Sequence, residues 1–199
     1  MEPVSRVVGR AIPINRANVD TDQIIPAKHL KRIERTGYGP FAFGAWREDP
    51  DFVLNNPAYE GAPILLAQQN FGSGSSREHA VWALQGLGIQ ALIAPSFADI
   101  FKNNCFQGGV LTVELPPEDV DWLIARAEES PEAEIDVDLE AQVVRAGPGW
   151  ERHFEIDAFR KYRLMRGLDD ISMTLEYEPD VATFEEQRPS YLTTTTGAG

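Results

Sequence analysis

The segment 70–79 gathers side chains that could do chemistry into one short stretch, with the sequence NFGSGSSREH. The hydroxyls of Ser75 and Ser76 and the guanidinium of Arg77 follow two glycines that lack a Cβ and so permit close approach of a ligand to the backbone. An arginine beside backbone N–H groups is suited to a carboxylate or a phosphate. The segment therefore predicts a small-anion site with hydroxyl groups in reach of the ligand.

The residues on either side predict a strand before this segment and a helix after it. The apolar run 62–67 has the length of a buried strand, and apolar residues recur at helical spacing over 80–87. In open α/β folds, ligands bind outside the carboxyl ends of strands, where helix N-termini present unpaired N–H groups and a partial positive charge. We therefore expect the segment at such an edge.

A purely structural interpretation of the segment is a capping box, in which Ser75 caps the helix and Glu78 reaches back to the Ser75 N–H. That interpretation explains neither Gly72 and Gly74 nor Arg77. Common phosphate loops do not fit either: the dinucleotide fingerprint needs glycine where Arg77 stands, and a Walker loop needs Gly-Lys-Ser/Thr. The nucleophile elbow G-x-S-x-G also fails, because no glycine stands two residues after either serine.

Composition places the chain among ordinary globular proteins and restricts its partners. The 199 residues are 43% hydrophobic and 25% charged. A net charge of −13 argues against nucleic acid or an anionic membrane as partner. No apolar run approaches the roughly 20 residues of a membrane span, and the first residues lack the features of a signal peptide. We expect a cytoplasmic protein.

Cys105 is the only cysteine, so the chain by itself cannot supply the several thiolates that hold an iron–sulfur cluster or a structural zinc. We expect no metal site in this chain, and any metal chemistry must come from a partner. The position of Cys105 near an expected helix end favours a buried, inert thiol.

Strands and helices are expected to alternate through the middle of the chain, which is the signature of an α/β core. The expected strands are 6–14, 62–68, 89–94, 109–115, 133–139, 141–146 and 152–156, and the expected helices are 76–87, one starting at 95–101, 117–129, 157–167 and 180–187.

We expect a single domain over 1–187, followed by a disordered tail over 188–199. The composition near 31–47 shifts to glycine, aromatic and basic residues, with Arg35-Thr36-Gly37-Tyr38-Gly39 at its centre, and regular structure is not expected there. We interpret this segment as a mobile loop that carries function, with a surface insertion as the alternative.

The segment 70–80, together with Asp20-Thr21-Asp22 upstream and 95–101 downstream, closely resembles the small subunit of 3-isopropylmalate dehydratase, in the aconitase superfamily. This resemblance is far more specific than one short motif, because it covers nearly the whole chain up to about residue 187. The further matching segments are 18–26, 35–37, 51–55, 136–140, 156–160 and 167–171.

The resemblance implies a swivelling β/β/α three-layer domain, equivalent to the last domain of aconitase. It also implies a hydro-lyase that is active only with a large subunit, which holds a [4Fe-4S] cluster. The implied reaction isomerises 2-isopropylmalate and 3-isopropylmalate through 2-isopropylmaleate in leucine biosynthesis, so that the substrate is a small hydroxy-dicarboxylic acid.

Two alternatives stay open. One is the small subunit of a related hydro-lyase, a homoaconitase or a citraconate/citramalate hydratase, because the loop near 31–47 is expected to touch the variable group of the substrate. The other is a non-catalytic anion-binding module. Asp22 beside Ser75 favours an enzyme, since a pure anion receptor needs donors rather than a carboxylate.

The resemblance also assigns roles to residues. Ser75 is the base that removes the carbon-bound proton, Asp22 is a second catalytic residue beside it, and Arg77 binds a substrate carboxylate. The other expected substrate contacts are Ser76, Arg35, Thr36 and Gly74. Thr21 and His79 are expected to contact these residues rather than the substrate. For His79, a packed helix residue is the more common role of a lone histidine.

Overall fold

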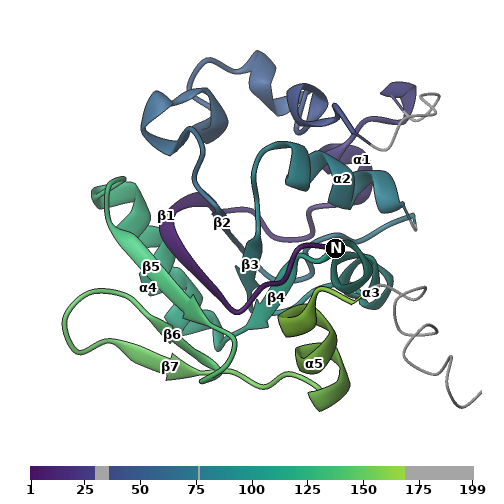
Figure 1. Cartoon of the computed structure of the whole chain (residues 1–199). Coiled ribbons are helices and arrows are strands. Elements are labelled where there is room, and N and C mark those ends of the chain that lie inside the picture. Colours follow the sequence, from purple (N-terminus) through teal and green to yellow (C-terminus); the bar gives the residue numbers. More distant parts are fainter. Residues whose placement is uncertain (30–35, 76, 169–199) are drawn as a thin grey trace, which may run out of the picture. The chain divides into compact units, whose positions relative to one another are not determined.

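The computed structural model describes residues 1–29, 36–75 and 77–168, and Met1–Gly167 form one compact unit (Figure 1). Arg35 and Ser76 therefore lie outside the described residues. The expected helix over 180–187 and the expected tail from 188 lie outside them as well.

A mixed sheet of seven strands forms the centre of this unit, in the order β4-β3-β2-β1-β5-β6-β7. The strands β1 to β4 pair in parallel, whereas β5, β6 and β7 continue from β1 in antiparallel pairs. The strands are β1 (Arg6–Ile14), β2 (Ile64–Ala67), β3 (Ala91–Ala94), β4 (Leu111–Glu114), β5 (Glu134–Asp138), β6 (Val143–Arg145) and β7 (Glu151–His153). The expected strand positions and the α/β class are confirmed.

Helices connect the parallel strands and cover the sheet (Figure 1). The helices are α1 (Thr21–Ile24), α2 (Glu78–Gly86), α3 (Asp99–Gly108), α4 (Pro117–Glu129) and α5 (Ala158–Arg166). The long connection from α1 to β2 contains single 3-10 turns among its described residues, at Ala27–His29, Gly39–Phe41, Trp46–Glu48, Val53–Asn55 and Pro57–Tyr59.

The sheet separates two hydrophobic cores, because successive side chains of a strand point to opposite faces. In β2, Leu65 and Ala67 join the core formed with α2 and α3, whereas Ile64 and Leu66 join the core formed with α4 and α5. All four residues of β2 are buried. The apolar run that predicts a strand in the sequence is thus explained by burial on both faces.

The described part of the segment near 31–47 contributes to the first core. Tyr38, Ala42 and Phe43 are fully buried, and the backbone at Gly39 approaches Gly86 so closely that a Cβ on either residue would overlap the other. These described residues are packed against α2 rather than forming a surface insertion. The mobility of the loop stays a prediction.

Two helices start later than the sequence predicts, because tertiary hydrogen bonds hold the preceding residues extended. The helix expected from residue 76 begins at Glu78, with Arg77 as an extended N-cap whose side chain makes no capping hydrogen bond. The Ser75–Glu78 capping box is therefore wrong. The capping box that forms is instead between Asp20 and Gln23 at the start of α1.

The start of α3 is delayed for a similar reason. Phe71 N–H donates to the Ser96 carbonyl at 3.2 Å, and Ala98 N–H donates to the Phe71 carbonyl at 3.0 Å. Residues 96–98 are thereby held as a short bridge beside the loop after β2, and the helix begins only at Asp99.

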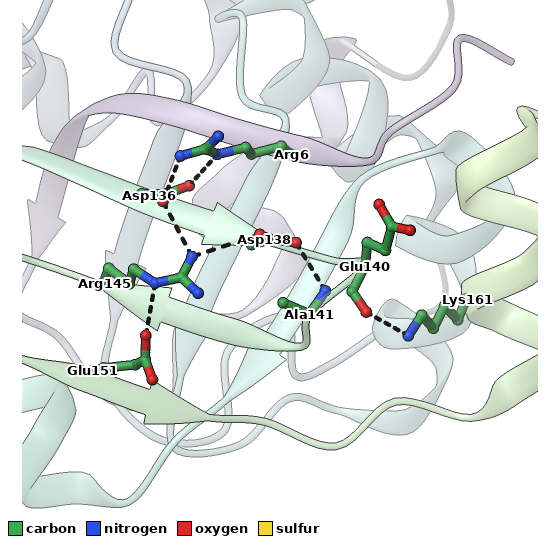
Figure 2. A network of polar contacts seen from close by, with 8 residues as sticks. All are labelled: Arg6, Asp136, Asp138, Glu140, Ala141, Arg145, Glu151 and Lys161. Carbon is green, nitrogen blue, oxygen red and sulfur yellow. Dashed lines mark hydrogen bonds and ion pairs between the residues drawn. The ribbon is translucent and has the colours of Figure 1, made fainter.

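A network of charged side chains lies on the face of β5 that points away from the second core (Figure 2). Arg6 on β1 donates two hydrogen bonds to Asp136, at 2.7 and 2.8 Å. Arg145 reaches Asp136 at 3.4 Å, Asp138 at 3.5 Å and Glu151 at 2.6 Å. The hydrogen bond from Arg6, followed by its Coulomb attraction, lowers the pKa of Asp136 below its ordinary value of 3.8.

Replacing Asp136 by asparagine should lower stability at neutral pH and have progressively less effect as pH falls. A carboxyl whose folded pKa is lowered stabilises the fold above its unfolded pKa, and this contribution is lost as pH falls through the folded value, here below pH 3.8. The effect should be modest, because the Arg6 side chain is 58% exposed and solvent screens the pair. The urea midpoints of wild type and Asp136→Asn, measured from about pH 7 to about pH 3, check this.

Glu134→Gln is the matched control, because Glu134 is an exposed carboxylate on the same strand that is not part of the network in Figure 2. The Glu134→Gln variant should have nearly the same urea midpoint as wild type across the whole pH range from about 7 to about 3. A difference between wild type and Asp136→Asn that stays constant with pH would contradict the assignment.

Candidate functional site

Three connections meet at the carboxyl edge of the parallel strands. They follow β1, β2 and β3, and two isolated bridges join them side by side, one between Asp20 and Ser73 and the other between Phe71 and Phe97. The reactive segment therefore lies where the sequence analysis places it, outside the carboxyl end of β2.

Thr21 fixes the backbone that leads to Ser75. The Thr21 N–H donates to the Ser73 carbonyl at 2.9 Å, and the Thr21 hydroxyl donates to the Ser75 carbonyl, also at 2.9 Å. Thr21 itself is buried. Ser75 is thus held through its carbonyl group, and the residue itself is exposed.

Gly72 and Gly74 are required by the shape of the turn. Their φ angles are +78° and +88°, in the left-handed region that side chains disfavour. A Cβ on Gly72 would lie 2.1 Å from the ring of Phe101, which is not possible without a shift of the helix. The backbone of the loop at Gly72 is therefore packed against the ring of Phe101 on α3.

A cavity of about 250 Å³ lies between this loop, the start of α1 and the start of α3. Its walls bring together four of the predicted site residues, which are Thr21, Gly74, Ser75 and Arg77. Its remaining lining residues are Gly72, Ala98, Asp99, Ile100, Phe101 and Asn104. This arrangement can receive a small anion, because Arg77 contributes a cationic side chain and Ser75 a hydroxyl-bearing side chain to the lining.

The α3 side of the cavity consists of residues for which the sequence predicts no role in a site. The segment 95–101 is part of the resemblance, but no site function is predicted for it. The signal that could have revealed it is the spacing of Ile100 and Asn104, which places the two side chains on one face of a helix that starts at the carboxyl end of a strand.

Asp22 holds Arg77. The Asp22 carboxylate accepts a hydrogen bond from the Arg77 guanidinium and forms an ion pair with it. The Arg77 side chain is 18% exposed and that of Asp22 is 55% exposed. Asp22 does not line the cavity, so the contact that the structure gives it is with Arg77 rather than with the space where a ligand would lie.

The other predicted residues are less closely associated with the cavity. His79 lies against Tyr38 and Trp82, with ring centroids 5.5 and 4.6 Å away, and does not line the cavity. Thr36 is exposed and is not a lining residue either. The contacts of His79 are those of a packed helix residue.

Cys105 lies in α3 and is fully buried, and this burial raises the pKa of its thiol well above the ordinary value. Such a thiol is a poor nucleophile and a poor metal ligand. Among the residues that the structure describes, no three His, Cys, Asp or Glu side chains are grouped as a metal site would require. Within the same residues, no helix has the length and apolarity needed to cross a membrane.

Comparison with known families defines the class of this domain. Residues 1–118 match the aconitase C-terminal domain, and residues 121–158 match the family model described as LeuD_N. A crystal structure of 3-isopropylmalate dehydratase (leuD) from Methanocaldococcus jannaschii superposes with a TM-score of 0.67. The superposition covers 89% of this chain and 98% of that one at 23% identity, and so supports the fold alone.

Sequence relatives identify the family within this class. The 3-isopropylmalate dehydratase small subunit of Rubrobacter xylanophilus is 60% identical over 192 residues, which are 96% of this chain and 98% of the relative. The protein of the same name from Parafrankia sp. is 54% identical, over 98% of this chain and 100% of the relative. The chain belongs to the family of 3-isopropylmalate dehydratase small subunits, and the resemblance predicted from its motifs is confirmed.

Proposed function

We propose that this chain is the small subunit of a dehydratase that interconverts 2-isopropylmalate and 3-isopropylmalate in leucine biosynthesis, together with a large subunit. The observation that carries the proposal is that Ser75 and Arg77 line the same cavity at the carboxyl edge of the sheet. The names of the relatives support it, since each is a small subunit of this dehydratase.

In this proposal, Ser75 accepts the carbon-bound proton. Removing a proton next to a carboxylate builds up negative charge, and a neutral serine hydroxyl is too weak a base to take that proton. The acceptor is therefore the Ser75 alkoxide, which nearby positive charge stabilises and which becomes the hydroxyl when the proton arrives. Arg77 supplies such a charge from the same cavity. The hydrogen bond from the Thr21 hydroxyl to the Ser75 carbonyl keeps the serine in place during the reaction.

Arg77 binds one carboxylate of the substrate, and Asp22 orients the guanidinium for that task. An arginine fork can donate to two carboxylate groups from different edges, so the ion pair with Asp22 is compatible with a bound substrate. Gly74 contributes backbone to the same cavity. Ser76, Arg35 and Thr36 remain proposed substrate contacts, and His79 is proposed to pack behind the site.

We propose that the large subunit holds the [4Fe-4S] cluster. The donor set of this chain does not fit a cluster, because its single cysteine is buried in α3. When bound, such a cluster supplies a Lewis acid for the departing hydroxyl group. The residues described above would then bind and orient the acid and move the proton. The cytoplasm is the proposed location.

Reconstitution tests the proposal. The purified chain, mixed anaerobically with a cluster-bearing large subunit, is expected to convert 3-isopropylmalate, with the unsaturated diacid followed by its ultraviolet absorbance. Either subunit alone should be inactive. Activity of the isolated small subunit would contradict the proposal, and preference for citramalate or a homoaconitate-type acid offered in parallel would reassign the substrate.

A further inference from the structure

Asn104 is a polar residue of the cavity whose side-chain Nδ2 donor is not paired within the described part of the chain. It lies on α3 one helical turn after Ile100, and both residues line the cavity that contains Ser75 and Arg77. The Asn104 Nδ2 atom is buried without a hydrogen-bond partner among the described residues. Because an unpaired buried amide destabilises a fold, the amide is not explained by the stability of this chain.

Asn103, the preceding residue on the same helix, has a side-chain amide with a structural role. Asn103 is exposed, and its Oδ1 accepts a hydrogen bond from Arg160 Nη2 at 2.5 Å. Asn103 thus connects α3 to α5. Asn104 makes no such connection through Nδ2, which is buried, although the residue lines the site cavity.

We infer that Asn104 is a substrate-binding residue whose amide donates a hydrogen bond to one carboxylate of the dicarboxylic acid while Arg77 binds the other. The inference rests on the proposed function. Among the described residues that line the cavity, Arg77 and Asn104 are the two with side-chain N–H donors, and a dicarboxylate presents two acceptor groups.

The local chemistry favours a donor at this position. The side-chain amide rotates readily about χ2, which exchanges the places of Nδ2 and Oδ1 and can turn the donor toward the cavity. Asp99, at the start of α3, also lines the cavity and repels a carboxylate. A neutral donor at Asn104, which follows Asp99 by five residues, can hold the second carboxylate without forming an ion pair with Asp99.

The test replaces Asn104 by leucine, which has a similar size and no donor, and measures steady-state kinetics of the reconstituted two-subunit enzyme with 3-isopropylmalate. The KM is expected to rise about tenfold or more, as for a lost hydrogen bond to a charged group. The thermal midpoint of the small subunit should stay the same or rise, because an unpaired polar group leaves the interior. Asn104→Ala, whose smaller side chain tolerates a tight site, should show the same rise in KM.

Asn103→Leu is the matched control and should leave KM unchanged. An unchanged KM in both Asn104 variants, with an active wild-type enzyme, would overturn the inference and leave the proposed function intact. A thermal midpoint that falls in both variants would assign the amide to the fold and also overturn it. An inactive wild-type assembly would instead refute the proposed function.

Discussion

Replacing Ser75 by alanine should abolish turnover of the reconstituted enzyme while leaving the fold and the association with the large subunit intact. If Ser75 accepts the carbon-bound proton, its removal eliminates the acceptor, and the loss should be at least about a thousandfold, within the range seen when an essential base or nucleophile is removed. The measurement is the turnover number at saturating 3-isopropylmalate.

The stability of this variant should be nearly that of wild type. Ser75 is not the cap of α2, and the hydrogen bond that holds it uses its carbonyl, which alanine retains. A change within about 0.5 kcal/mol is expected for such an exposed position. Ser73→Ala is the matched control, because Ser73 lies in the same turn and does not line the cavity. Turnover near wild type in Ser75→Ala would place the base elsewhere.

Replacing Arg77 by lysine should lower kcat/KM by roughly tenfold to a hundredfold. Lysine keeps the positive charge and can still pair with Asp22, but it lacks the planar fork that binds two carboxylates from separate edges. Steady-state kinetics of the reconstituted enzyme check this, and the thermal midpoint of the variant should change little. An unchanged kcat/KM would reduce Arg77 to a partner of Asp22 without a role in binding.

The strands β2 and β3 were predictable because each is an apolar run whose residues are all buried. The residues at which α2 and α3 begin were not predictable, because these positions depend on hydrogen bonds between residues far apart in the chain. The bond from Thr21 to the Ser75 carbonyl joins two connections, and the bridge between Phe71 and Phe97 joins another pair. Local propensity contains no information about such pairs.

The candidate site, too, could be predicted only where its residues are close together in the sequence. Ser75 and Arg77 are close in sequence, so their residue types alone indicate an anion site. Asn104 comes from the next crossover, and its unpaired amide becomes visible only when α3 is packed against the loop. The pairing of Asp22 with Arg77 likewise needs the fold to bring α1 beside the turn.

The central position of β1 has a consequence for how this chain forms during synthesis. β1 pairs with β2 on one side and with β5 on the other, where Arg6 lies opposite Asp138. The parallel half can assemble as soon as α3 and β4 have left the ribosome, but the second edge of β1 stays unpaired until β5 is made. Open strand edges recruit other chains. We therefore expect nascent chains that stall before residue 134 to aggregate more than chains that also contain β5, β6 and β7.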